Sequence, residues 1–256
     1  MNKTFAFLAI ASAAVLAMGS AQAYTTFNGV DANGAETVLA LTPNAAAAEA
    51  AFKNNLIGTG TETFESQTTG AGVPLSLNFG IAGTATLNGG SGIVASNAAG
   101  STNGAGRYSV PGGTKFWQVS AGGANTFVVN FSQDVAAFGF YGIDIGDFQG
   151  TLSLEFLNGV GGVIGSKLVT TAAENLANAS VLYFGALADS DAELFRGVRF
   201  VTTGGTGDVF AFDSFTIGAK EQVVVPPPVP NPVSAPGTLA LAALGLLGAG
   251  LVRRRS

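Results

Sequence analysis

Short runs in which apolar residues alternate with polar or small ones recur along the chain. In the run 125–132, Phe127, Val129 and Phe131 share one face, because successive side chains of a strand point to opposite sides. Glycine, aspartate and asparagine bound the runs, which predicts a mainly β fold: an antiparallel β-sandwich of jelly-roll type. The seven runs are 74–80, 125–132, 136–146, 151–158, 180–188, 197–203 and 208–218.

A helical pattern precedes these runs. Strong helix formers fill the stretch 43–55, where Pro43 suits the first helical position and Thr42 can cap the helix. We therefore expect the main domain, residues 24–220, to open with one short helix and to continue as strands. The glycine-rich stretch 89–106 is interpreted as long loops or an uneven edge of a sheet.

The first 23 residues have the layout of a secretory signal peptide. Lys3 is followed by an apolar middle, and the segment 1–23 ends in the small-residue pattern Ala21-Gln22-Ala23. A buried N-terminal helix is the alternative, but it does not explain this ending. We expect export, with Tyr24 as the first residue of the mature protein.

The other end combines a spacer, an apolar run and a positive cluster. The segment 221–232 is rich in proline and predicts an extended, stiff spacer. The apolar run 239–252 has 14 residues. As a helix it would be about 21 Å long, against about 30 Å for a bilayer core. We expect a short C-terminal transmembrane helix, with Arg253, Arg254 and Arg255 held on the cytoplasmic side.

A short proline motif precedes the apolar run, with Val233, Pro236, Gly237 and Thr238 in the best register. With the helix and the arginines, the segment 233–256 resembles a PEP-CTERM sorting signal, also labelled an ice-binding protein C-terminal domain. The family's usual Val-Pro-Glu-Pro is altered, because serine and alanine replace its first proline and its glutamate. The resemblance covers only this tail.

The resemblance implies export and recognition by an exosortase-type membrane enzyme. It also implies removal of the helix and arginines. The inner-membrane intermediate would then pass to the surface or extracellular matrix of a Gram-negative bacterium. The ice-binding label is not taken as an activity, because threonines such as Thr84 and Thr86 are scattered. The body, with "TFE", "GIDIGDF" and "FAFDSFTIG", more loosely resembles a group of exported proteins with this tail.

Charge and composition exclude several classes of function. Removing Lys3 and the three terminal arginines from the 11 basic residues leaves 7 against 16 acidic ones, a net charge near −9. Such a surface repels nucleic acid, so no nucleic-acid partner is expected. The chain has no cysteine and no histidine, which removes disulfides, cysteine nucleophiles, serine–histidine–acid triads and nearly all zinc chemistry.

Carboxylates remain as candidate site residues. Glu65, in "TFESQ", and Asp213, in the run 208–218, resemble the Phe-Glu pair and last-strand aspartate of galactose-binding-like jelly rolls. That resemblance implies a structural calcium ion, which takes six to eight oxygen ligands. The alternative is that both acids only accept hydrogen bonds at strand ends. For Asp144 and Asp147 we expect a turn, with metal or ligand binding as the alternative.

These observations favour a non-enzymatic surface or matrix protein that binds glycans or exopolysaccharide. One alternative is a purely structural spacer. The other is a glycoside hydrolase using Asp144 and Asp147, which would need two acids at a set separation across a cleft. Trp117 is interpreted as a core or rim residue rather than a sugar platform.

Overall fold

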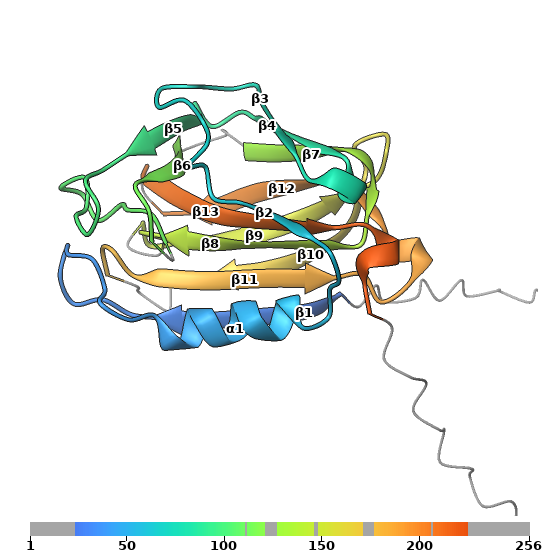
Figure 1. Cartoon of the computed structure of the whole chain (residues 1–256), viewed down its shortest axis with the longest axis horizontal. Helices are drawn as coiled ribbons and strands as arrows, with labels where there is room; N and C mark the ends of the chain where they lie inside the picture. Colours follow the sequence, from blue (N-terminus) through green and yellow to red (C-terminus); the bar gives the residue numbers. More distant parts are fainter. Residues whose placement is uncertain are drawn as a thin grey trace, which may run out of the picture. The chain divides into compact units, whose positions relative to one another are not determined.

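Alternating apolar residues build two antiparallel β-sheets that pack face to face (Figure 1). The computed structural model describes residues 24–110, 112–120, 127–145, 148–170, 177–205 and 207–224. One sheet has the order β1 (Thr25–Asp31), β11 (Val181–Leu187), β8 (Ala137–Ile143), β13 (Val209–Gly218), β6 (Lys115–Ser120) and β5 (Ile93–Ser96), with β2 (Gly60–Glu62) also on β13. The other has the order β10 (Val163–Thr170), β9 (Gly150–Leu157), β12 (Phe195–Gly204), β7 (Phe127–Val135), β4 (Thr84–Asn88) and β3 (Leu75–Asn78).

Phenylalanine rings fill the space between the sheets. Phe127, Val129 and Phe131 of β7 are all buried there, which confirms their predicted common face. The rings of Phe200 and Phe212, from opposite sheets, meet edge to face with centroids 4.9 Å apart. Each predicted run carries a strand of the sandwich, so the mainly β, two-sheet prediction is confirmed.

The helix α1 (Pro43–Lys53) lies along β1 and β11, on the outer side of the larger sheet (Figure 1). Its Phe52 is fully buried in a second apolar cluster there. Gly139 and Gly185 make room for this ring, because a Cβ on them would lie 2.8 and 2.7 Å from its carbon atoms. The second cluster fixes α1 and the loops beside it to the sheet.

The start of the domain differs from the prediction. The strand β1 precedes α1, so the expectation that the domain opens with a helix was wrong. Thr42 makes no side-chain cap. Instead, Asp31 at the end of β1 accepts hydrogen bonds from the backbone N–H groups of Asn44 at 3.1 Å and Ala45 at 2.8 Å. A carboxylate at the end of the preceding strand thus satisfies two N–H groups of the helix N-terminus, 13 and 14 residues further along the chain.

The described chain continues past Lys220. A short 3-10 helix, η4 (Lys220–Gln222), buries Gln222, whose Nε2 donates to the carbonyl oxygen of Gly58 at 2.6 Å. The predicted signal peptide 1–23 and sorting signal 233–256, together with spacer residues 225–232, lie outside the described residues. Within the described ranges, no helix has the length and apolar character to cross a membrane.

Candidate functional site

An open cleft of about 620 Å³ lies between two loops. The loop before α1 and the loop between β5 and β6 lie at the same end of the sandwich (Figure 1). The segment 38–43, just before α1, forms one wall together with Ala46. The segments 97–101, 108–110 and 112–114, between β5 and β6, form the other. We call this the loop cleft. Its volume lies within the range of about 300–1,000 Å³ that is common for ligand sites.

Tyr108 ties the two walls together. Its buried hydroxyl accepts a hydrogen bond from the backbone N–H of Leu39 at 3.3 Å and donates to the carbonyl oxygen of Ala179 at 3.1 Å. Burial raises the pKa of this hydroxyl, and the carboxylates of Asp144 and Asp31 raise it further against the opposing effect of the Leu39 amide. Tyr108 therefore stays protonated and keeps both hydrogen bonds at neutral pH.

Asp213 anchors the second wall through hydrogen bonds to Ser109 and Val110. Its side chain is fully buried on β13, and Oδ2 accepts hydrogen bonds from Ser109 Oγ at 2.7 Å and Val110 N–H at 3.0 Å. Its other oxygen accepts from the N–H of Ser214 at 2.6 Å. Burial raises the pKa of Asp213 well above its ordinary value, because the three hydrogen bonds do not offset desolvation, and the charge of Glu65 adds to it.

Glu65 holds the same wall from its outer end. Its Oε1 accepts the backbone N–H groups of Thr114 at 2.8 Å and Lys115 at 2.7 Å, and Oε2 accepts the Thr114 hydroxyl at 3.0 Å. Burial alone would raise the pKa of Glu65, but these hydrogen bonds and the Lys115 charge together lower it. Gly113 lies against Glu65 and Ser109: a Cβ there would be 2.4 Å from Glu65 Oε1 and 3.1 Å from Ser109 Oγ.

The fold thus brings Glu65 and Asp213 to the same loop, 109–115, because β2 pairs with β13 at Glu62 and Phe215. The described partners of both carboxylates are hydrogen donors from the segment 109–115 and Ser214. Among the residues that the structure describes, no group of three or more acidic, histidine or cysteine side chains could hold a metal ion. These N–H and O–H donors show that the two carboxylates anchor the loop. Calcium binding by the pair stays a prediction.

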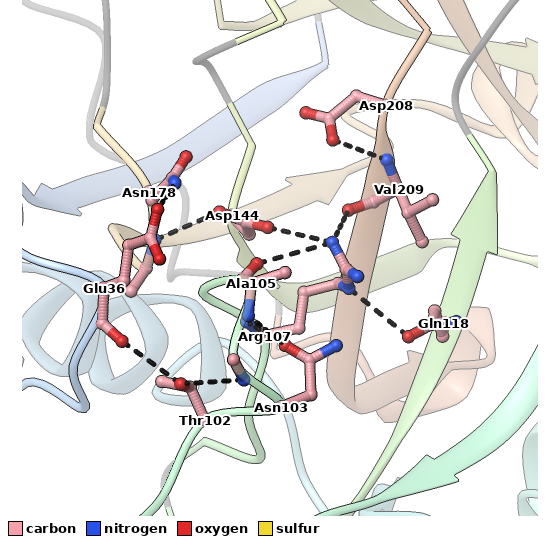
Figure 2. A network of polar contacts seen from close by, with 12 residues as sticks. Glu36, Thr102, Asn103, Ala105, Arg107, Gln118, Asp144, Asn178, Asp208 and Val209 are labelled. Carbon is pink, nitrogen blue, oxygen red and sulfur yellow. Dashed lines mark hydrogen bonds and ion pairs between the residues drawn. The ribbon is translucent and has the colours of Figure 1, made fainter.

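Asp144 belongs to a second polar network, which links it to Arg107 in the segment between β5 and β6 (Figure 2). It follows β8 directly, with a left-handed φ of 62°, and its side chain is buried. Its Oδ1 accepts the N–H of Ala179 at 3.1 Å, and its Oδ2 pairs with Arg107 Nη1 at 3.3 Å. Asp144 is therefore paired with a cation in the described structure, whereas Asp147 lies outside the described residues.

Arg107 is the centre of this network, and the sequence reasoning missed it. Its Nη1 also donates to the carbonyl oxygens of Val209 at 3.1 Å and Ala105 at 3.4 Å, and its Nε donates to Gln118 Oε1 at 3.3 Å (Figure 2). A signal was present, because Arg107 is the only basic residue between Lys53 and Lys115.

Trp117 takes no part in the loop cleft. It is fully buried between the sheets, where its ring stacks on Phe64 with centroids 6.1 Å apart and an interplanar angle of 19°. This confirms the interpretation of Trp117 as a core residue and leaves Tyr108 as the aromatic residue that lines the cleft.

No family model and no curated protein matches the chain. Among solved structures, the K2 cleaved adhesin domain of Lys-gingipain is 13% identical, with a TM-score of 0.39 over 62% of this chain and 97% of that one. An arabinose-bound α-L-arabinofuranosidase is 15% identical, with a TM-score of 0.38 over 64% of this chain and 26% of that one. A DUF4465 family protein from Bacteroides ovatus is 11% identical, with a TM-score of 0.30 over 76% of this chain and 98% of that one. Likenesses this distant carry no argument about function.

Proposed function

We propose that the chain is an exported, non-enzymatic protein of the cell surface or extracellular matrix that binds a glycan in the loop cleft. The observation that carries the proposal is the cleft itself. Its volume suits a sugar unit, its two walls are joined by Tyr108, and the wall that includes 108–114 is anchored by Glu65 and Asp213. A site whose walls are already held in place binds with less loss of conformational entropy.

The placement of the acids supports a non-catalytic role. Glycosidases use two carboxylates whose pKa values are shifted apart, and Glu65 and Asp213 have shifts in opposite directions. Asp213, however, is fully buried beneath Ser109 and Val110, and neither acid is among the residues that line the loop cleft. Their described partners are groups of the protein, which favours anchoring over catalysis.

The ends of the chain supply the rest of the proposal. A leader over 1–23 would export the protein, and an exosortase-type enzyme would process the tail 233–256 after the apolar run 239–252 enters the inner membrane. The spacer would hold the domain away from that surface. We also retain the jelly-roll connection of the strands as part of this proposal.

Binding and catalysis are separated by one experiment on the protein purified from its producing cells. The protein is sedimented with the producer's exopolysaccharide, and released sugar is assayed in the supernatant. We expect binding without release. Ala99→Trp, at an exposed position lining the cleft, should abolish sedimentation. Val160→Trp, at a position 91% exposed outside the cleft lining, is the control and should bind like the parent.

Three other results would contradict the proposal. Sugar release that disappears in Asp144→Asn would favour the hydrolase alternative. Absence of both binding and release would favour a structural spacer. Binding that is insensitive to Ala99→Trp would place the glycan elsewhere on the surface.

A further inference from the structure

The walls of the loop cleft carry no charge. Every described residue that lines it is apolar or a neutral polar residue. The two cations next to lining residues in the sequence are engaged elsewhere, because Arg107 pairs with Asp144 and Lys115 Nζ donates to the carbonyl oxygens of Glu65 and Gln67. The mature chain has a net charge near −9, from 7 basic and 16 acidic residues. A uronate, phosphate or sulfate group would lose its hydration in such a site without gaining a counter-charge. The occupant is therefore neutral.

One wall is aliphatic and partly open to solvent. Val38, Leu39, Leu41 and Pro43 line it, and the Leu41 side chain is 80% exposed. An exposed leucine at the mouth of a cleft gains free energy when a ligand covers it with apolar surface. A plain hexose presents hydroxyl groups around most of its rim. A sugar that carries a methyl group fits this wall better.

The opposite wall offers a hydrogen-bond acceptor. Asn97 uses its Nδ2 group to donate to the carbonyl oxygen of Arg107 at 2.6 Å and to that of Ser101 at 3.4 Å. Its Oδ1 accepts no hydrogen bond from the residues that the structure describes. An amide oxygen with an unused lone pair suits an N–H donor. Hydroxyls at Ser101 and Thr114 line the same wall and can bond ring hydroxyls.

We infer that the loop cleft recognises N-acetylated amino sugars within a neutral or weakly charged polysaccharide. The acetamido group has both features that the walls call for. In a polymer of such sugars, the methyl of one unit packs on the aliphatic wall at Leu39 and Leu41, and the N–H of another unit donates to Asn97 Oδ1. This inference rests on the proposed glycan binding and names the class of sugar.

The test is a titration of the protein with four defined probes: the β-1,4 trimer of N-acetylglucosamine, the matching glucose trimer, L-rhamnose and trigalacturonic acid. We expect the acetylated trimer to bind about tenfold more tightly than the glucose trimer, the effect of losing a buried methyl and one hydrogen bond. Methyl spectra should show shifts at Leu39 and Leu41. Trigalacturonic acid should not bind.

Three variants locate the effect. Leu41→Ser removes the exposed aliphatic surface and should bring the acetylated trimer to the affinity of the glucose trimer. Ile57→Ser changes a residue that is 68% exposed outside the cleft lining and should leave the preference intact. Ala99→Trp should block all binding.

The results separate the two proposals. Equal affinity for the acetylated and glucose trimers, or tighter binding of trigalacturonic acid or rhamnose, would overturn the inference about the sugar class. Glycan binding in the cleft would survive these results if Ala99→Trp still blocked it. Binding of the acetylated trimer that persists in Ala99→Trp would overturn both.

Discussion

The rings of Tyr141 and Tyr183 meet edge to face beneath α1, with centroids 5.1 Å apart and an interplanar angle of 72°. Only one of the two hydroxyls has a described partner. Tyr141 donates to Glu49 Oε2 at 2.8 Å, whereas the buried hydroxyl of Tyr183 has no hydrogen-bond partner in the described part of the chain. Burial raises the pKa of both hydroxyls, so both are neutral at ordinary pH.

This asymmetry predicts opposite effects of the same substitution. Tyr141→Phe should lower the free energy of unfolding by about 1.5–3 kcal/mol, because it removes a hydrogen bond to a carboxylate. Tyr183→Phe should leave it unchanged or raise it, because it removes a buried, unpaired polar group. Urea unfolding of the two variants checks this. A larger loss for Tyr183→Phe than for Tyr141→Phe would contradict it.

The ion pair of Arg107 and Asp144 is the next test. Their side chains are 14% and 3% exposed, so removing one charge leaves the other uncompensated. We expect Asp144→Asn, which tolerates the left-handed backbone, to cost about 3 kcal/mol in unfolding free energy. The pair of Arg196 and Asp134, 3.7 Å apart and 42% and 57% exposed, is the control. Asp134→Asn should cost less than about 1 kcal/mol, and equal losses at both sites would refute the burial argument.

Asp213 predicts a dependence of stability on pH. Its pKa in the folded state is raised, mainly by burial, so folding favours the protonated form. This contribution is fully present below the unfolded pKa of about 3.9 and is lost as pH rises through the folded pKa. Glu65 acts in the opposite sense, because its lowered pKa makes its contribution disappear as pH falls.

Asp213→Asn isolates the first effect. The variant should lose the part of the Tm decrease that the parent shows as pH rises from about 4 through the folded pKa of Asp213. Scanning calorimetry across that range measures it. Glu221→Gln removes the same kind of charge at an exposed site and should keep the parent's slope. An unchanged slope in Asp213→Asn would show that other groups set the pH dependence.

The strands that the sequence predicted are those whose own residues alternate toward the core, such as β7 with Phe127, Val129 and Phe131. The strand β1 was missed because its sequence, "TTFNGVD", lacks that alternation. It forms at the edge of the sheet by pairing with β11 and packing under α1. Its burial thus comes from partners far along the chain, which periodicity does not report.

The candidate site shows the same difference between what local patterns predict and what depends on partners far along the chain. The pairing of Glu65 with Asp213 was implied by the resemblance to galactose-binding-like jelly rolls, and β2, just before Glu65, does pair with β13. The donors that the two acids hold come from the glycine-rich loop around Gly113, whose path no local pattern fixes. The loop cleft was missed for that reason, since it exists only where this loop approaches the segment 38–46.

Gly92 lies against the indole ring of Trp117, which predicts a large effect of adding one methyl group. A Cβ at residue 92 would lie 2.2 Å from Cζ2 of the indole, and Trp117 is fully buried. We expect Gly92→Ala to lower the free energy of unfolding by about 1–3 kcal/mol through overpacking. Because the chain has one tryptophan, its emission should shift as well. Gly34→Ala, with nothing within 4 Å, should leave both unchanged.

Calcium binding at Glu65 and Asp213 can be tested separately. If the two carboxylates share an ion, calcium stabilises only the folded state, by about 2.7 kcal/mol at a concentration 100 times Kd. A chelator should then lower the Tm, and Glu65→Ala should abolish that sensitivity. Thr114→Val is the control, because it removes one donor to Glu65 while keeping both carboxylates. It should lower the Tm but retain the chelator effect. A parent protein whose melting curve is the same with calcium and with chelator would show that the two acids hold the loop through hydrogen bonds alone.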